Sequence, residues 1–152
     1  MKRYLLLLAM ATGLTMTGFA QEKEKEEKNE KSVVAPAAAK AAFTKAFPGA
    51  SKVKWTKEKA DFEVGFTQGG KEMSAVYDTK GTLKETEVDI KISELPATAA
   101  EYIKQHYKGA KIKEAAKLTL ANGDVNYEAE VNGTDVMFDA NGKFLKEVKE
   151  KD

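Results

Sequence analysis

The side chains that could carry out chemistry in this sequence are one histidine and a set of carboxylates. His106 is the only histidine, and the chain has no cysteine. Thiol nucleophiles, CxxC redox chemistry and cysteine-based zinc sites are therefore excluded. A general base needs a nucleophile and an orienting partner within reach. Because His106 lies one residue off the apolar stripe of a predicted helix and near the end of that helix, we expect a surface or capping role for it.

Two pairs of carboxylates occupy corresponding positions of an internal repeat, Glu63 with Glu128 and Glu72 with Asp135. Paired catalytic carboxylates need surroundings that separate their pKa values. Alternation along the predicted strands turns Glu63 and Glu128 outward, onto an open sheet face that we expect to bury little. Cross-strand pairing of Glu with Lys explains these positions more simply, and we expect no enzymatic activity.

The segment Asp139-Ala140-Asn141-Gly142 resembles the start of a calcium-binding loop. Both repeats have a turn at this place, so a hairpin explains the pattern without a bound ion. Asp78-Thr79-Lys80-Gly81 has a similar pattern. Both are therefore interpreted as four-residue turns that end on a glycine, and we expect no metal and no cofactor.

The elements that position these side chains come from a duplication, since residues 36–87 return in altered form at residues 96–148. Pro36, Ala39, Phe43 and Phe47 correspond to Pro96, Ala99, Ile103 and Tyr107. Phe62-Glu63-Val64 corresponds to Tyr127-Glu128-Ala129, and the two Asp turns correspond to each other. Such a repeat indicates that the same structural unit occurs twice along the chain.

Each repeat is predicted to contain one helix followed by four strands. Ala39, Phe43 and Phe47 form a helical stripe, and strand residues such as Phe62, Val64 and Phe66 alternate with polar ones. Ser93 is a candidate N-cap for the second helix. A unit of about 60 residues buries too little surface to be stable alone. We therefore predict one compact α+β domain with a shared core, two helices on one face of a curved antiparallel sheet, and a wet opposite face.

The chain is predicted to be exported. Residues 1–20 have a basic start, an apolar stretch and a small-residue site ending at Ala20, as in a signal peptide. Residues 21–32 are almost all Glu and Lys, which favours a disordered spacer. The domain then covers residues 33–152, divided into repeats 33–91 and 92–152.

The charge of the chain is balanced, with 25 basic and 24 acidic residues. Lysines and glutamates alternate along the sequence without forming a basic stripe. This pattern predicts a surface of mixed charge and disfavours nucleic acid as a partner. No stable membrane insertion is expected after cleavage of the leader.

The paired P-A-x-x-x-x-x-F segments, the [FY]-E-[VA] strands and the [FY]-D-x-x-G turns resemble the PepSY-like family, also called beta-lactamase-inhibitor-like. The resemblance covers about residues 33–150. It implies a tandem α-β-β-β-β fold and a periplasmic or secreted location. It implies no assigned activity and transfers no catalytic residue. In true beta-lactamase inhibitors of similar architecture, the open sheet face binds an enzyme. The resemblance therefore suggests a protein-binding role.

Alternation places an apolar residue at the same outward position of each repeat, Val76 in the first and Met137 in the second. An apolar centre with a polar rim is typical of protein-binding surfaces. The principal hypothesis is a non-catalytic exported protein that engages a periplasmic or extracellular protein, with inhibition of a periplasmic enzyme as one form. The alternative is a binder of a small or lipid-like ligand between helices and sheet. The candidate contact residues are Val76, Met137, Glu63, Thr67, Ser74, Glu128 and Glu130.

Overall fold

The computed structural model describes residues 32–149. The predicted signal peptide and all but the last residue of the predicted spacer lie outside the described residues. Within 32–149, neither helix combines the length and apolar character that crossing a membrane requires.

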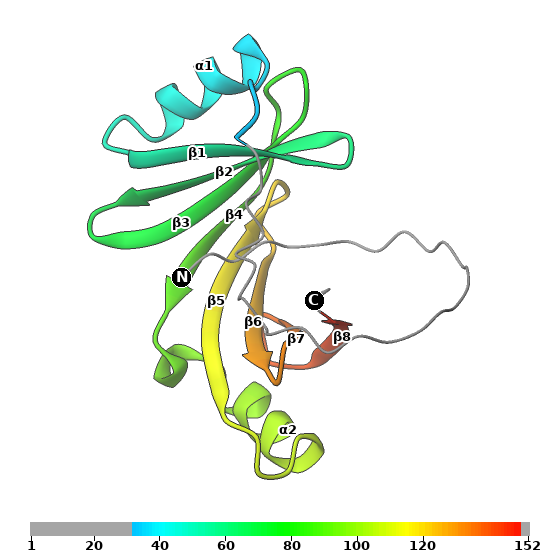
Figure 1. The fold of residues 1–152 in the computed structure, drawn as a ribbon. Coiled ribbons are helices and arrows are strands. Elements are labelled where there is room, and N and C mark those ends of the chain that lie inside the picture. Colours follow the sequence, from blue (N-terminus) through cyan, green and yellow to red (C-terminus); the bar gives the residue numbers. More distant parts are fainter. Residues whose placement is uncertain (1–31, 150–152) are drawn as a thin grey trace, which may run out of the picture.

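Each repeat folds as one α-helix followed by four strands, as predicted (Figure 1). The first repeat contains α1 (Ala37–Ala46), β1 (Ser51–Glu58), β2 (Asp61–Gln68), β3 (Lys71–Tyr77) and β4 (Leu83–Ile90). A short 3₁₀ helix, η1 (Ile92–Glu94), connects the repeats. The second repeat contains α2 (Ala97–His106), β5 (Ile112–Leu120), β6 (Val125–Val131), β7 (Thr134–Asp139) and β8 (Phe144–Lys149).

The strands form one eight-stranded sheet in which each strand pairs with its neighbours in the sequence. All the pairs are antiparallel, including β4 with β5, which joins the two repeats. The register connects Val64 to Ala75, Thr86 and Thr119 across β2–β5. Thr119 and Ala115 lie on the same face of β5, because residues two apart share a face. The apolar residues beneath both helices therefore lie on one side of the sheet, which we call the helix face.

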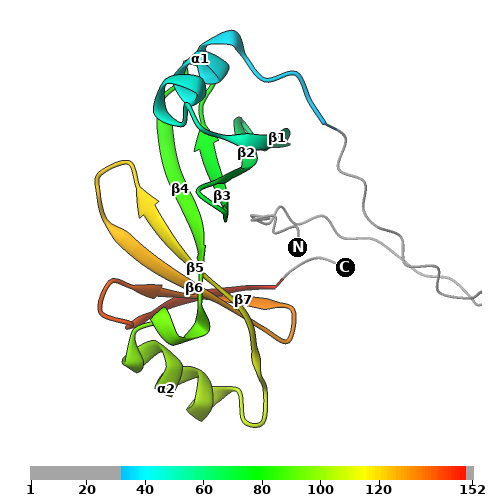
Figure 2. The ribbon, with the colours of Figure 1, turned by 90° about the vertical axis from the view of Figure 1, so that its left-hand side faces the viewer.

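The opposite side of the sheet, which we call the concave face, carries Glu63, Val76, Glu128 and Met137. Figure 2 shows the sheet curving between its ends, with α1 and α2 at the outer ends of the curve. Each helix packs its apolar stripe against the strands that follow it in the sequence. The concave face is left without a helix among the described residues.

Each helix packs over its own apolar core, and the predicted shared core is wrong. Under α1, Phe43 contacts Trp55 and Phe66 with ring centroids 5.6 Å and 5.0 Å apart. Under α2, Ile103 belongs to a second buried cluster, whose members include Val136 and Phe138. The two clusters have no residue in common. The helices contact opposite ends of the sheet, so the repeats are joined through the β4–β5 ladder instead.

The predicted N-cap of the second helix also needs correction. Ser93 lies within η1, and α2 begins after Pro96 without a side-chain cap. In β1, Val53 shares the parity of the buried Trp55, but the Val53 side chain is 44% exposed. The cause is a register irregularity between Ser51 and Lys54, where Lys52 takes a positive φ of 53°. Such a bulge changes which face the neighbouring side chain meets.

The two Asp turns place a glycine against the start of each helix. Gly81 has a φ of +83°, and a Cβ at this position would lie 2.6 Å from the carbonyl oxygen of Ala38 in α1. Gly142 has a φ of +78°, and its Cβ would lie 2.8 Å from the backbone nitrogen of Ala99 in α2. Glycine is therefore required twice over, for its backbone conformation and for the close approach.

Candidate functional site

The residues predicted to contact a partner all lie on the concave face. Glu63 stands opposite Val76 in the β2–β3 pair, and Glu128 stands opposite Met137 in the β6–β7 pair. Strand alternation gives the remaining members the same orientation. They are Thr67 on β2, Ser74 on β3 and Glu130 on β6. The alternation in the sequence was therefore sufficient to identify the face.

These residues do not form one continuous patch. Thr67, Ser74 and Val76 belong to β2 and β3, whereas Glu130 and Met137 belong to β6 and β7. Strands β4 and β5 separate the two groups. Strand spacing puts β3 and β7 roughly 19 Å apart along the sheet. Equivalent positions of the two repeats therefore mark two separate places on the concave face.

The concave face was expected to be exposed to solvent, and this expectation is wrong for its centre. Met137 is 5% exposed and packs with Ala116 and Leu118 of β5. Glu128 is 3% exposed, whereas Val76 is half-buried. Curvature brings side chains on the inside of a sheet closer together than a flat sheet would. Glu63 is also buried, at 7% exposure. The expectation that the side chains of Glu63 and Glu128 are exposed to solvent is therefore wrong.

Sequence reasoning identified Met137 but missed the other two apolar residues at this centre. Ala116 and Leu118 are buried on the concave face, and Ala115 is buried on the helix face. The segment Ala115-Ala116-Lys117-Leu118 has apolar residues at both parities. Alternation therefore gave no preference, and only the register with Asp89 and Glu87 of β4 places Ala116 and Leu118.

Curvature also brings charges on distant strands near one another. Burial raises the pKa of the Glu85 carboxyl, and the negative charge of Glu58 raises it further. Lys146 opposes this effect. Glu58 lies on β1, Glu85 on β4 and Lys146 on β8. Charges on the two edge strands and on a central strand therefore influence one another across the concave face.

The carboxylates do not assemble into a catalytic pair. Glu63 and Glu128 lie on β2 and β6, so the repeat-related residues do not meet. Glu130 stands opposite Asp135, and the ammonium group of Lys113 contacts the Glu130 carboxylate at 2.7 Å. Within residues 32–149, no group of His, Asp and Glu side chains has the arrangement of a metal site. The contact that the structure shows here is an ion pair within the sheet, between Lys113 and Glu130.

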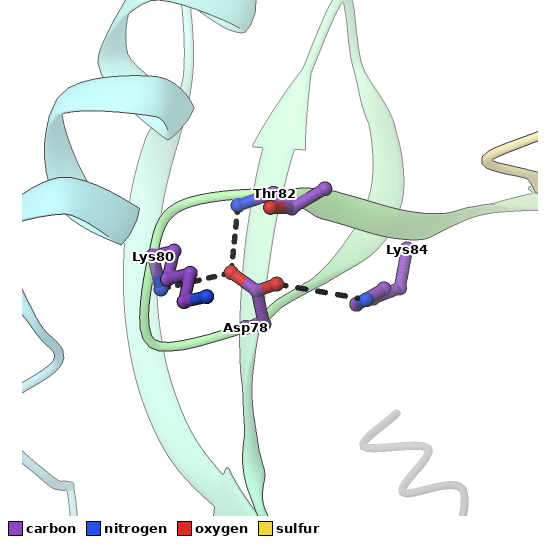
Figure 3. Close-up of polar contacts among 4 residues, drawn as sticks. All are labelled: Asp78, Lys80, Thr82 and Lys84. Carbon is purple, nitrogen blue, oxygen red and sulfur yellow. Dashed lines mark hydrogen bonds and ion pairs between the residues drawn. The ribbon is translucent and has the colours of Figure 1, made fainter.

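The Asp turns use their carboxylates to hold the backbone. Asp78 Oδ1 accepts hydrogen bonds from the backbone N–H groups of Lys80 at 2.8 Å and Thr82 at 2.9 Å (Figure 3). Asp139 Oδ1 accepts the equivalent bonds from Asn141 and Lys143. The turn interpretation is confirmed, because these oxygens stabilise the loops from within.

We expect Asp78 to make stability depend on pH. The hydrogen bond from the backbone N–H of Thr82 is the main cause that lowers the pKa of the Asp78 carboxyl. The positive charge of Lys84, 3.5 Å from Asp78 Oδ2, makes the smallest contribution to this lowering. A lowered folded-state pKa gives stability that is present above the unfolded pKa of about 4 and is lost as the pH falls through the folded value. The difference in unfolding free energy between the native chain and Asp78→Asn should therefore be largest near neutral pH and shrink in acid.

Urea denaturation between pH 2 and pH 7 measures this difference. Lys84→Gln is the matched control, because it removes the ion pair and keeps the backbone hydrogen bonds of Asp78. It should preserve most of the pH dependence. A difference between native and Asp78→Asn that stays constant over the whole pH range would contradict the assignment.

His106 has the surface role predicted for it. Its ring is stacked on Tyr102 with centroids 3.9 Å apart, and its Nδ1 lies 2.9 Å from the Tyr102 carbonyl oxygen. Both residues belong to the last turns of α2. The side chain is exposed on the outside of the helix. It therefore does not contribute to the concave face.

The fold and this face define an α+β protein with an open eight-stranded antiparallel sheet and two helices on one side. The sequence matches, at residues 20–85 and 60–146, the family described as "Putative beta-lactamase-inhibitor-like, PepSY-like". The chain belongs to this family, as the repeat predicted. No curated protein matches it.

Several solved structures share the fold. A putative periplasmic protein of Bacteroides eggerthii has a TM-score of 0.69 and 15% sequence identity, covering 76% of this chain and 89% of that one. A DUF2874 family protein of Bacteroides uniformis has a TM-score of 0.67 and 18% identity, with the same coverage. A BLIP-like protein of Bacteroides fragilis has a TM-score of 0.60 and 19% identity, covering 83% of this chain and 95% of that one.

Proposed function

We propose that this chain is an exported, non-catalytic protein that binds a protein partner through its concave face. The observation that carries the proposal is the placement of the predicted contact residues on one curved sheet face that neither helix covers. The family and its BLIP-like structural neighbour favour binding over catalysis. The periplasmic description of another neighbour favours export.

The shape of the face supports a macromolecular partner. It extends over all strands of the sheet and is curved, so that it can surround a protruding loop. On β2 and β3 the half-buried apolar residue Val76 lies among half-buried polar residues, Ser74 and Thr67. Protein interfaces combine an apolar core and a polar rim in this way. Inhibition of a periplasmic enzyme is one form that such binding takes in this proposal.

The alternative of a ligand between helices and sheet has less support. The space beneath α1 is filled by aromatic rings, including Phe43, Phe47 and Phe66. Beneath α2, Tyr102 stacks on Phe144 with centroids 4.8 Å apart. A ligand at either place would have to displace packed side chains, at a cost of several kcal/mol on the order of a large-to-small core substitution.

Site-specific photo-crosslinking tests the proposal. A benzophenone-bearing residue at Val76 lies on the concave face, and one at Thr119 of β5 lies exposed on the helix face. We expect the full chain, expressed in the cell that exports it, to form a covalent adduct with another protein from position 76 and not from position 119. Val76→Arg should weaken capture in extracts, whereas Thr119→Arg should not. Adducts from position 119 alone, or none from either, would overturn the proposal.

A further inference from the structure

The balanced charge of the chain is divided between the two faces of the sheet. On the described strands, the concave face carries two lysines, Lys54 and Lys146, and Lys113 reaches it from the β5 irregularity. Its acidic residues are far more numerous. They are Glu58, Asp61, Glu63, Glu72, Glu85, Glu87, Asp89, Glu114, Glu128, Glu130, Asp135 and Asp139.

The helix face has the opposite charge. The lysines that the register and alternation place there are Lys57, Lys71, Lys84, Lys117 and Lys149. Glu147 is the one acidic residue of the described strands on that side. On the strands, one sign of charge therefore dominates each face in place of the predicted mixture. Lysine and glutamate alternate in the sequence, and strand alternation then sends them to opposite faces.

The acidic face also contains the apolar centre formed by Ala116, Leu118 and Met137. Glu128 stands beside this centre, opposite Met137 and Ala116 on the two neighbouring strands. Glu87 stands opposite Leu118. Lys and Arg side chains combine an apolar stem with a charged head. Because the centre itself is buried, the apolar side chain of this face that such a stem can reach is the half-buried Val76, opposite Glu85.

This chemistry discriminates between classes of partner. A surface dominated by one sign of charge attracts the opposite sign and disfavours like-charged partners. Nucleic acid and anionic lipid would be repelled by the carboxylates. A bound metal ion would require converging ligands, and residues 32–149 contain no such group. A basic protein segment complements the charge of the face, and its aliphatic stems can contact Val76.

We propose that the concave face binds a lysine- or arginine-rich segment of a protein partner. This inference rests on the proposed function and specifies the chemistry of the partner at the same face. The accessible carboxylates of the face receive the cationic heads, and the half-buried Val76, which stands opposite Glu85, contacts the stems. The half-buried Glu85 and Asp89 on β4 guide the segment onto the face.

Titration of the full chain with a hexalysine peptide tests this inference, with amide chemical shifts as the readout. We expect shifts in β4, β6 and β7, smaller ones in α1 and α2, and binding that weakens as salt rises. Hexaglutamate should produce none of these shifts. The double variant Glu85→Gln, Asp89→Asn removes two charges from the concave face. It should weaken hexalysine binding about tenfold.

The matched control, Glu101→Gln with Glu147→Gln, removes two charges from the helix side and should change the affinity less than about twofold. Equal weakening by both double variants would overturn the inference. So would calcium chloride that reproduces the shifts and displaces hexalysine. Self-association abolished by the concave variant would identify a second copy as the occupant and also overturn it. If hexalysine fails while crosslinking from position 76 persists, the charge assignment is wrong and the proposed function stands.

Discussion

Gly81→Ala should destabilise the protein by about 3 kcal/mol, from about 1–2 for a left-handed backbone at a residue with a Cβ and about 1–3 for overpacking. The φ of Gly81 is +83°, and the added Cβ would lie 2.6 Å from the Ala38 oxygen and 2.8 Å from the Ala38 carbonyl carbon. Both neighbours are backbone atoms of α1, so they cannot move away by changing a rotamer. The helix would have to shift away from the sheet.

Gly70→Ala separates the two contributions. Gly70 has a similar φ of +78°, and a Cβ there would meet no atom within 4 Å. This control should cost only about 1 kcal/mol, the backbone contribution alone. Urea denaturation of both variants gives the two free energies of unfolding. Equal losses would show that the contact between the turn and α1 does not constrain the fold.

Phe43→Ala should cost about 3–5 kcal/mol, the usual range for removing a buried Phe. Phe43 is 5% exposed and contacts three rings, those of Phe47, Trp55 and Phe66. Because the two cores are separate, we expect most of the loss to appear in the first repeat. Native-state hydrogen exchange should therefore accelerate in β1–β3 more than in β6 and β7.

Ile103→Ala is the matched change in the second repeat, because Ile103 of α2 is 2% exposed and faces the sheet as Phe43 does in α1. It should give the reverse pattern, with faster exchange in β6 and β7. Phe43→Leu provides a milder variant with the same expected distribution if the alanine variant is too unstable to purify. Uniform acceleration across β1–β8 in both variants would mean that the β4–β5 ladder makes the sheet one cooperative unit.

Local patterns were enough to predict the elements and the face. Helical spacing of Phe43 and Ile103, and alternation through Phe62, Val64 and Phe66, follow from the geometry of single elements. The Asp turns were predicted because Asp and Gly have specific turn roles. Each of these signals lies within a few residues of the structure that it predicts.

Properties that depend on several strands at once could not be predicted in this way. The exposure of Val53 follows from the irregularity at Lys52, a residue type that does not signal a positive φ. The burial of Met137 depends on the register that brings Leu118 to the same face. Single strands such as β4 place Glu85, Glu87 and Asp89 at one parity, but only the register of all the strands puts the carboxylates of different strands on one face.

The strand order, which equals the chain order, has a consequence for how the protein folds. Hairpins close short loops, and proteins dominated by such local contacts fold faster than those with distant pairings. The β4–β5 pair is the exception, since residues 91–111 and the whole of α2 separate its strands. We therefore expect the hairpins within each half to form first. Joining the halves along β4 and β5 closes the longest connection between paired strands and should be the slower step.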